Sequence, residues 1–333
     1  MGQVSKKTAR RAAASPAGSA TLTAESPRRP CPCGSGRRYK ACHGGSDPAD
    51  LIVSRPFAGL AAETELIALR EFVPSATAPL TLRAAAASAD DAAAPDGAGT
   101  LPTPSVTLAT VLPGAAAALT RSDGSVLLGL QVQTHSGDLA RDLATALEWA
   151  LAAEPSSVLA VVGRATLGPR WADLVVDEPL QVTVHEDFGW WLESDPEPGS
   201  EVAASLERAN GAVMPSAKIA DLPGAYWVDT GDKAHLRWVR PEDEQTLMAA
   251  LARVAAAGEL DLGEGTRYVG SFRAHGCLVP VWDLDRDAHP SEWTEPVRAF
   301  AARLEVALAS DEPLTDAQRR ARDGILGRQF TLR

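Results

Sequence analysis

Hydrophobic positions along the chain follow two repeats, one typical of strands and one typical of helices. Short runs rich in valine and leucine, bounded by turn residues, predict strands. These runs are VTLATVL (106–112), SVLLGLQVQT (125–134), SVLAVVG (157–163) and LQVTVHE (180–186). Two further pairs of runs, each joined by a short polar turn, predict β-hairpins. They are 225–229 with 235–240, and 267–274 with 277–284.

Helical spacing separates and follows these strands. Four leucines at four-residue spacing lie along one stripe of a helix, which would end at Pro155. They are Leu139, Leu143, Leu147 and Leu151. Either Ser136 or Asp138 is a candidate N-cap for this helix. A second strong helix is predicted with Pro241 in its first turn, three acids near its start and Gly258 at its end. Further helices are predicted at 201–210, 291–309 and 315–327.

Hairpins that alternate with helices predict an α+β fold, in which helices pack on one face of a largely antiparallel sheet. The strand at 125–134 and the strand at 277–284 are each followed by a polar turn and a long Leu/Ala-rich helix. A duplicated ββα unit is therefore a further hypothesis for the body.

Changes in composition divide the chain. Residues 1–29 are rich in Ser, Ala and Pro and are predicted to be a disordered basic arm. A cysteine cluster occupies 30–45, and a linker follows at 46–57. The α+β body is expected to span 58–333, with a low-complexity surface loop near 84–104.

The net charge of −11 hides an asymmetry. Residues 1–46 hold 9 basic residues and 1 acidic residue, a balance of +8, whereas the remainder holds 23 basic and 42 acidic residues, a balance of −19. An acidic body with a basic arm is not a general nucleic-acid surface. The arm itself fits an anionic partner such as RNA, lipid or an acidic protein face, or it is only a solvated tail.

The sequence shows no secretory signal, because no apolar region follows the charged start. No run reaches the roughly 18 apolar residues that a membrane-spanning helix needs. Three clustered cysteines and a distant one, Cys277, do not resemble a disulfide framework. Free thiols fit a reducing compartment, so the expected location is the cytoplasm.

The cluster PCPCGSGRRYKACHGG holds Cys31 and Cys33, then eight intervening residues, then Cys42 and His43. Three thiolates and an imidazole match a closed tetrahedral zinc site. Glycines between the two ligand pairs permit the turn that folds the pairs toward one point. A segment this short has almost no core, so metal ligation is what would fold it.

The run PCPCGSGRRYKACHG resembles the SEC-C motif, the zinc-binding tail of the SecA translocation ATPase and of other bacterial proteins. That resemblance implies that Cys31, Cys33, Cys42 and His43 are the zinc ligands, and that the motif is a docking module. No G-x-x-x-x-G-K-[ST] run occurs, so the activity of the ATPase motor does not carry over.

The remainder is similar to an uncharacterised actinobacterial family in which the SEC-C motif precedes an α+β body. The runs ALREFVPSATAPLTL and LATVLPGAAAALTRSDGSVLLGLQVQTHSGD carry this similarity. It implies no particular activity.

Three functions remain open on these observations. The first is a protein-docking role for the zinc knuckle. The second is association with a nucleic acid or the ribosome through the arm and knuckle. The third is an enzyme whose site is assembled from residues distant in sequence, although a non-enzymatic role is favoured. The oligomeric state is left open.

Other candidates for chemistry have simpler explanations. Cys277 after His275 suggests a nucleophile and base, but a thiol packed as a small hydrophobic group is favoured. His185 lacks the spacing of a helical zinc protease site and is interpreted as the end of a strand. Of the pair Trp190-Trp191, neighbours on a strand would face opposite sides, so one could be exposed, although burial under a loop is favoured.

Overall fold

The computed structural model describes residue 38 and residues 52–84, 104–163, 168–219 and 221–327. The chain divides into two units, Met1–Ser46 and Asp47–Arg333, and the described helices and strands belong to the second. The predicted arm, the zinc knuckle apart from Arg38, and nearly all of the predicted low-complexity loop lie outside the described residues. Their boundaries therefore stay predictions.

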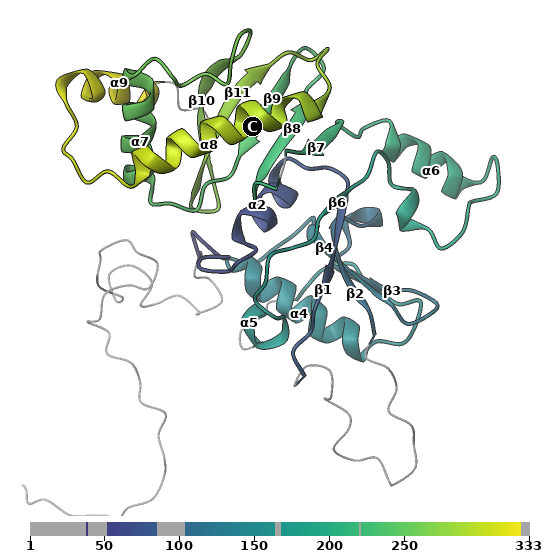
Figure 1. Ribbon diagram of the computed structural model, residues 1–333. Coiled ribbons are helices and arrows are strands. Elements are labelled where there is room, and N and C mark those ends of the chain that lie inside the picture. The colour runs from purple at the N-terminus through teal and green to yellow at the C-terminus, as the bar shows by residue number, and fades with distance from the viewer. Residues whose placement is uncertain (1–37, 39–51, 85–103, 164–167, 220, 328–333) are drawn as a thin grey trace, which may run out of the picture. The chain divides into compact units, whose positions relative to one another are not determined.

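The first of two sheets has six strands in the order β5-β3-β4-β2-β1-β6 (Figure 1). Among the described strands of this sheet, β2 and β4 are the one parallel pair. The predicted turn Arg121–Gly124 folds β3 back against β4 as an antiparallel pair. The strands are β1 (Ala76–Leu80), β2 (Val106–Val111), β3 (Ala118–Thr120), β4 (Val126–Gln131), β5 (Val158–Leu159) and β6 (Thr183–Val184).

The second sheet is antiparallel throughout, in the order β10-β11-β9-β8-β7. Its strands are β7 (Ser216–Lys218), β8 (Ala225–Asp229), β9 (Ala234–Trp238), β10 (Arg267–Ala274) and β11 (Cys277–Leu284). Both predicted hairpins are confirmed. The β10–β11 hairpin turns at His275 and Gly276, whose φ angles of 45° and 81° suit a tight two-residue turn. A Cβ on Gly276 would lie 2.7 Å from Cβ of Arg55, so only glycine fits there.

Seven α-helices are described. They are α2 (Glu63–Glu71), α4 (Leu139–Ala152), α5 (Trp171–Leu174), α6 (Glu201–Asn210), α7 (Glu244–Ala256), α8 (Thr294–Leu308) and α9 (Asp316–Leu326). The carboxylate of Asp138 accepts from the amide of Arg141 and caps α4, as predicted. Helix α7 begins at Glu244 and not at Pro241. Its N-cap is Asp243, whose carboxylate accepts hydrogen bonds from the backbone amides of Gln245 and Thr246.

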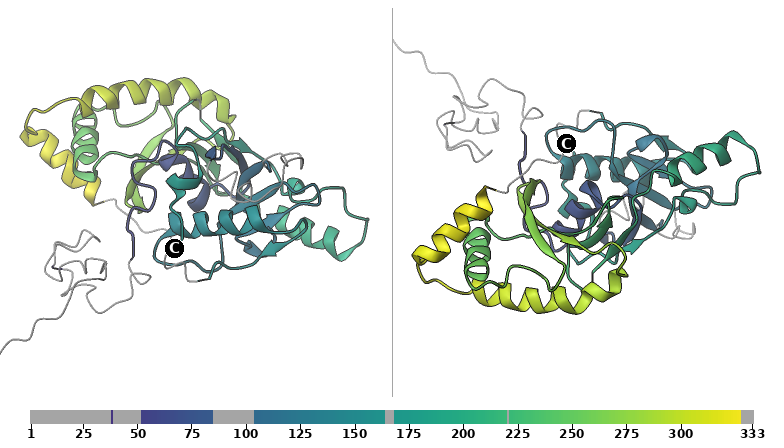
Figure 2. Two further views of the ribbon diagram at one scale, coloured as in Figure 1. Left: turned by 90° about the horizontal axis from the view of Figure 1, so that it is seen from below. Right: turned by 90° about the horizontal axis from the view of Figure 1, so that it is seen from above.

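Helices α7, α8 and α9 share an apolar core with one face of the second sheet (Figure 2). Helix α2 lies between the two sheets (Figure 1). Its side chains Leu66 and Ile67, and Phe72 directly after it, belong to a core with residues of both sheets. Helix α4 packs on the first sheet through its leucine stripe. Helix α2 therefore joins the sheets, and its polar residues enter the interior.

The predicted α+β class is confirmed, with a mixed sheet beside the antiparallel one. The order hairpin–helix occurs in β3-β4-α4, in β8-β9-α7 and in β10-β11-α8. The predicted strands at 157–163 and 180–186 shrink to two residues each, β5 and β6, since each pairs with one neighbour over two positions only. No helix in the described ranges is long and apolar enough to cross a membrane.

Candidate functional site

The four predicted zinc ligands, Cys31, Cys33, Cys42 and His43, lie outside the residues that the structure describes. Within the described ranges, no group of three or more His, Cys, Asp and Glu side chains is placed to hold a metal ion. The ligand set fits zinc by the chemistry of its donors, since thiolate sulfur and imidazole nitrogen are the ligands of closed structural zinc sites. It stays a prediction from the sequence.

The first turn of α2 carries two buried carboxylates. Glu63 and Glu65 in its first turn are 4% and 3% exposed, although carboxylates are almost never buried without a partner. Burial of this turn follows from its sequence, because Leu66, Ile67 and Leu69 pack against both sheets and carry the glutamates inward. The helix N-terminus also favours negative charge.

Glu63 is neutralised by Arg55, which precedes the helix. The guanidinium donates Nε to one carboxylate oxygen at 2.5 Å and Nη2 to the other at 2.7 Å. The same Nη2 also donates to the carbonyl of Pro241 at 2.6 Å. The hydrogen bond to Glu63 raises the pKa of Arg55, so the guanidinium stays charged. Arg55 thus connects the segment before α2 to Pro241, which follows β9 of the second sheet.

Cys277 lies next to this ion pair, with its Sγ 3.7 Å from Oε1 of Glu63. Burial, with the nearby Glu63 charge, raises the pKa of the thiol to about 12. A neutral thiol is a poor nucleophile, because the thiolate is the reactive form. The side chain of His275 meanwhile lies 2.7 Å from Glu71, so it is engaged elsewhere. The interpretation of Cys277 as a packed, inert thiol is the one that fits.

Glu65 has two partners from the second sheet. Tyr226 donates its hydroxyl to Oε2 at 2.5 Å, and Nζ of Lys218 lies 2.8 Å from Oε1. Burial and the Glu65 charge together raise the pKa of Tyr226, which stays protonated as the donor. Both buried glutamates therefore have a basic partner, and the contacts of Glu65 fasten α2 to the second sheet.

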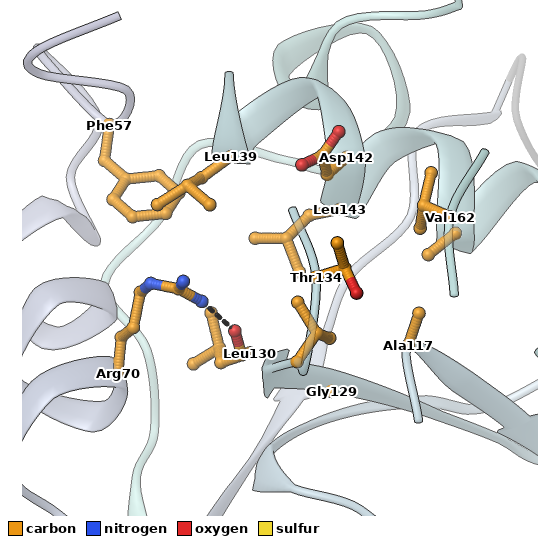
Figure 3. A pocket seen from close by; sticks show the side chains of 12 residues that line it. Phe57, Arg70, Ala117, Gly129, Leu130, Thr134, Leu139, Asp142, Leu143 and Val162 are labelled. Atoms are coloured by element: carbon orange, nitrogen blue, oxygen red, sulfur yellow. Dashed lines mark hydrogen bonds between the residues drawn. The ribbon is translucent and has the colours of Figure 1, made fainter. Parts of the chain in front are cut away.

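A small cavity lies between α2, α4 and β4 (Figure 3). Arg70 points into it and donates Nη1 to the carbonyl of Leu130, and Asp142 approaches from α4 (Figure 3). Asp142 is 6% exposed; its Oδ2 accepts from the amide of Ser136, whereas Oδ1 has no partner among the described residues. Burial lowers the pKa of Arg70. The volume is about 20 Å³, enough for one or two water molecules and too small for a substrate.

A larger cleft of about 420 Å³ opens between α2, the end of β9 and α8. Arg240, 6% exposed, stacks over Trp238 at 4.4 Å and donates to Glu242 at 2.5 Å and Glu305 at 3.0 Å. Glu63 lines the same cleft and is paired with Arg55. The carboxylates of this cleft are thus engaged by arginines, and the arrangement supplies charge balance.

The remaining sequence candidates have structural partners. His185 contacts Thr77 Oγ1 through Nε2 at 2.8 Å, and burial lowers the pKa of this histidine. Trp190 and Trp191 lie in a 3₁₀ turn and not on a strand, and both are half-buried, which agrees with the favoured interpretation of burial under a loop. Their indole N–H groups donate to Ser75 and to Val111. Both tryptophans thus pack against the first sheet through the loop that carries them, so a packing role fits both.

Sequence reasoning missed α2 and its glutamates. The run LAAETELIALREFV mixes polar and apolar residues around the helix axis, so it shows no continuous apolar stripe. The burial of its glutamates follows from packing against both sheets, for which the local pattern carries no signal.

Two family models match the chain. The SEC-C motif matches residues 30–45, which contain all four predicted zinc ligands. A family of unknown function (DUF5926) matches residues 56–333, the whole of the described α+β body. No curated protein and no solved structure matches the chain. Because the second match spans most of its length, this chain belongs to the DUF5926 family of unknown function.

Proposed function

We propose that this protein is a zinc-dependent docking protein. Zinc held by Cys31, Cys33, Cys42 and His43 folds residues 30–45 into a compact knuckle, and the knuckle binds a protein partner. The match of the SEC-C motif to these residues is the observation that carries the proposal. Ligation is worth roughly 10–16 kcal/mol in small zinc peptides at neutral pH, enough to fold a segment without a core.

The body fits the role of a scaffold for this knuckle. The carboxylates of its larger cleft accept hydrogen bonds from Arg55 and Arg240, so their lone pairs already serve the fold. The buried thiol of Cys277 is held neutral. Thiolate ligands also need a reducing compartment, which favours the cytoplasm.

A second candidate function is binding to RNA or the ribosome. The balance of +8 over residues 1–46 favours it, because clustered lysine and arginine attract phosphates and release their counterions. The two candidates differ in salt dependence. Binding through Z phosphates weakens with a slope of about −0.7Z to −0.9Z in log K against log salt, whereas a docked protein interface responds weakly.

The first experiment measures zinc in the purified full-length chain by elemental analysis. The wild-type chain is expected to hold one zinc ion per chain, and the double variant Cys31→Ser/Cys33→Ser none. Cys277→Ser is the matched control, because it also loses a thiol but keeps all four predicted ligands. Equal zinc in the double variant and the wild-type chain would contradict the ligand assignment.

The second experiment compares partners recovered by these three chains under nuclease treatment. We expect one or more proteins to be retained about tenfold more by the wild-type chain and Cys277→Ser than by the double variant. Purified ribosomes are then titrated at increasing salt. Identical recovery by all three chains contradicts a role for the knuckle in docking, and a steep salt slope with ribosomes selects the second candidate.

A further inference from the structure

One half-buried arginine in the described part of the chain, Arg237, lacks an oxygen partner. Every other half-buried or buried arginine there has an oxygen atom within 3.9 Å. They are Arg55, Arg70, Arg121, Arg141, Arg240, Arg253, Arg303 and Arg322. The guanidinium of Arg237 instead lies over the ring of Phe72, with its carbon 5.8 Å from the ring centroid. This exception points to a partner that the described protein does not supply.

The position of Arg237 makes the exception stronger. It lies on β9, the middle strand of the second sheet, and its register partners are Tyr226 on β8 and Val281 on β11. It therefore shares the sheet face that looks toward α2, where Tyr226 and Phe72 pack. A guanidinium has five donor N–H groups, and because Arg237 is only half-buried these donors stay open to water or to a ligand that arrives from solvent.

Other basic side chains lie on the same face. His235 is two residues away on β9, and its Nδ1 lies 3.2 Å from Oδ1 of Asp283. Lys233 and Arg267 contact the other oxygen of Asp283 at 2.5 Å and 3.2 Å. Lys218 lies beyond Tyr226 in the same row of the sheet and contacts Glu65. Five basic side chains thus share this face with two carboxylates, in a body whose overall balance is strongly acidic.

We propose that Arg237 is the anchor of a binding site for an oxyanion, a phosphate or carboxylate group of a small ligand, with His235 as a second donor. The planar guanidinium fork matches two oxygens of either group. Nδ1 of His235 is taken by Asp283, which leaves Nε2 for the ligand. The two carboxylates of this face are already engaged by Lys218, Lys233 and Arg267. The proposal does not depend on the zinc knuckle.

Charge on this face supports the assignment. Burial lowers the pKa of Arg237, and no carboxylate opposes that shift. Burial, together with Arg237 and Lys233, also lowers the pKa of His235 in spite of Asp283. A bound anion would favour the charged form of both side chains, because it places negative charge beside two partly desolvated basic groups.

The test uses the full-length chain and two probes, inorganic phosphate and acetate, each exchanged for chloride at constant ionic strength. Affinity is obtained from the ligand dependence of thermal unfolding, because a ligand of the native state raises the midpoint by mass action. Arg237→Met removes the fork at similar side-chain length, and Arg237→Lys keeps the charge without the fork. Arg298→Met removes an exposed arginine of α8 and is the matched control.

We expect Arg237→Met to weaken binding of the better probe at least tenfold, Arg237→Lys severalfold, and Arg298→Met less than twofold. Binding of phosphate alone assigns the site to tetrahedral anions, and binding of acetate assigns it to carboxylates. The proposal is overturned if neither phosphate nor acetate raises the thermal unfolding midpoint of the wild-type chain above its value in chloride. If Arg237→Met fails to fold, Arg237→Lys decides the matter, and an unchanged affinity in that variant would equally overturn it.

Discussion

Helices α2 and α4 contribute to the same apolar core but are held there in different ways. Helix α4 (Leu139–Ala152) buries one stripe, including Leu143 and Leu147, and keeps residues such as Glu148 in water. Helix α2 (Glu63–Glu71) is buried from Glu63 through Leu69 and has no side-chain N-cap. Helix α4 is a surface element with an apolar side and a single buried carboxylate, Asp142, whereas α2 is a core element with two buried glutamates in its first turn.

This difference decides what a substitution costs. On α4 a truncated leucine loses its own packing, and the polar face can rehydrate freely. On α2 a removed carboxylate leaves a partner cation or hydroxyl in a dry interior, and unpaired buried groups are far more costly than lost contacts. Helix α2 should therefore be the more sensitive of the two to changes in polar residues.

Glu65→Leu is expected to have the largest effect. It leaves the hydroxyl of Tyr226 and the amine of Lys218 without their partner, although Lys218 is 28% exposed and can partly rehydrate. We expect a loss of about 3–4 kcal/mol in the free energy of unfolding, measured by urea titration. The matched control is Glu148→Leu on the exposed face of α4, with a change within about 0.5 kcal/mol. Similar losses in both variants would remove the distinction between the helices.

Leu147→Ala tests the apolar stripe of α4. Leu147 is fully buried in the core beneath the helix, so its truncation should cost about 3 kcal/mol of unfolding free energy. Leu151→Ala, half-buried on the same stripe, should cost clearly less. If the two truncations cost the same in urea titrations, then the stripe is not packed as deeply at Leu147 as the structure shows.

The same two helices show how far the sequence predicts the fold. The leucines of α4, its cap Asp138 and its end before Pro155 were all visible, because a half-buried helix must alternate apolar and polar faces. Both hairpins of the second sheet were visible through their turns. Helix α2 was not, since an element buried on all sides has no such alternation. Strands β5 and β6 were expected to be longer, because pairing depends on partners that the local pattern does not contain.

The candidate sites divide in the same way. The zinc ligands Cys31, Cys33, Cys42 and His43 lie within one short segment, so their spacing alone predicts them. Arg237 and Tyr226 are adjacent only through strand pairing, and Glu65 meets Lys218 across a long stretch of chain. Such contacts depend on the register of the sheet, which one sequence does not specify.

A smaller effect is expected at the start of α4. Asp138→Ala removes the carboxylate that accepts from the amide of Arg141 at 3.2 Å, and it should cost about 1 kcal/mol of unfolding free energy. Asp138→Asn should recover most of this loss, because asparagine also caps well. No cost in urea titrations of Asp138→Ala would show that this helix end needs no side-chain cap, and α2 has none.

The smallest effect concerns the last residue of α2. The hydrogen bond to His275 lowers the pKa of Glu71, whose side chain is 30% exposed. A carboxyl whose pKa is lower in the folded chain stabilises it above the unfolded value of about 4.3, and this stabilisation is lost as the pH falls through the folded value. Glu71→Gln should therefore flatten the stability profile below about pH 5, by roughly 0.5 kcal/mol because solvent screens the pair. Glu148→Gln, exposed and on α4, should leave the profile unchanged. If the unfolding free energy of Glu71→Gln depends on pH as that of the wild-type chain does, down to pH 3, then Glu71 does not stabilise α2. The polar contacts that hold the helix would then be those of its buried glutamates, Glu63 and Glu65.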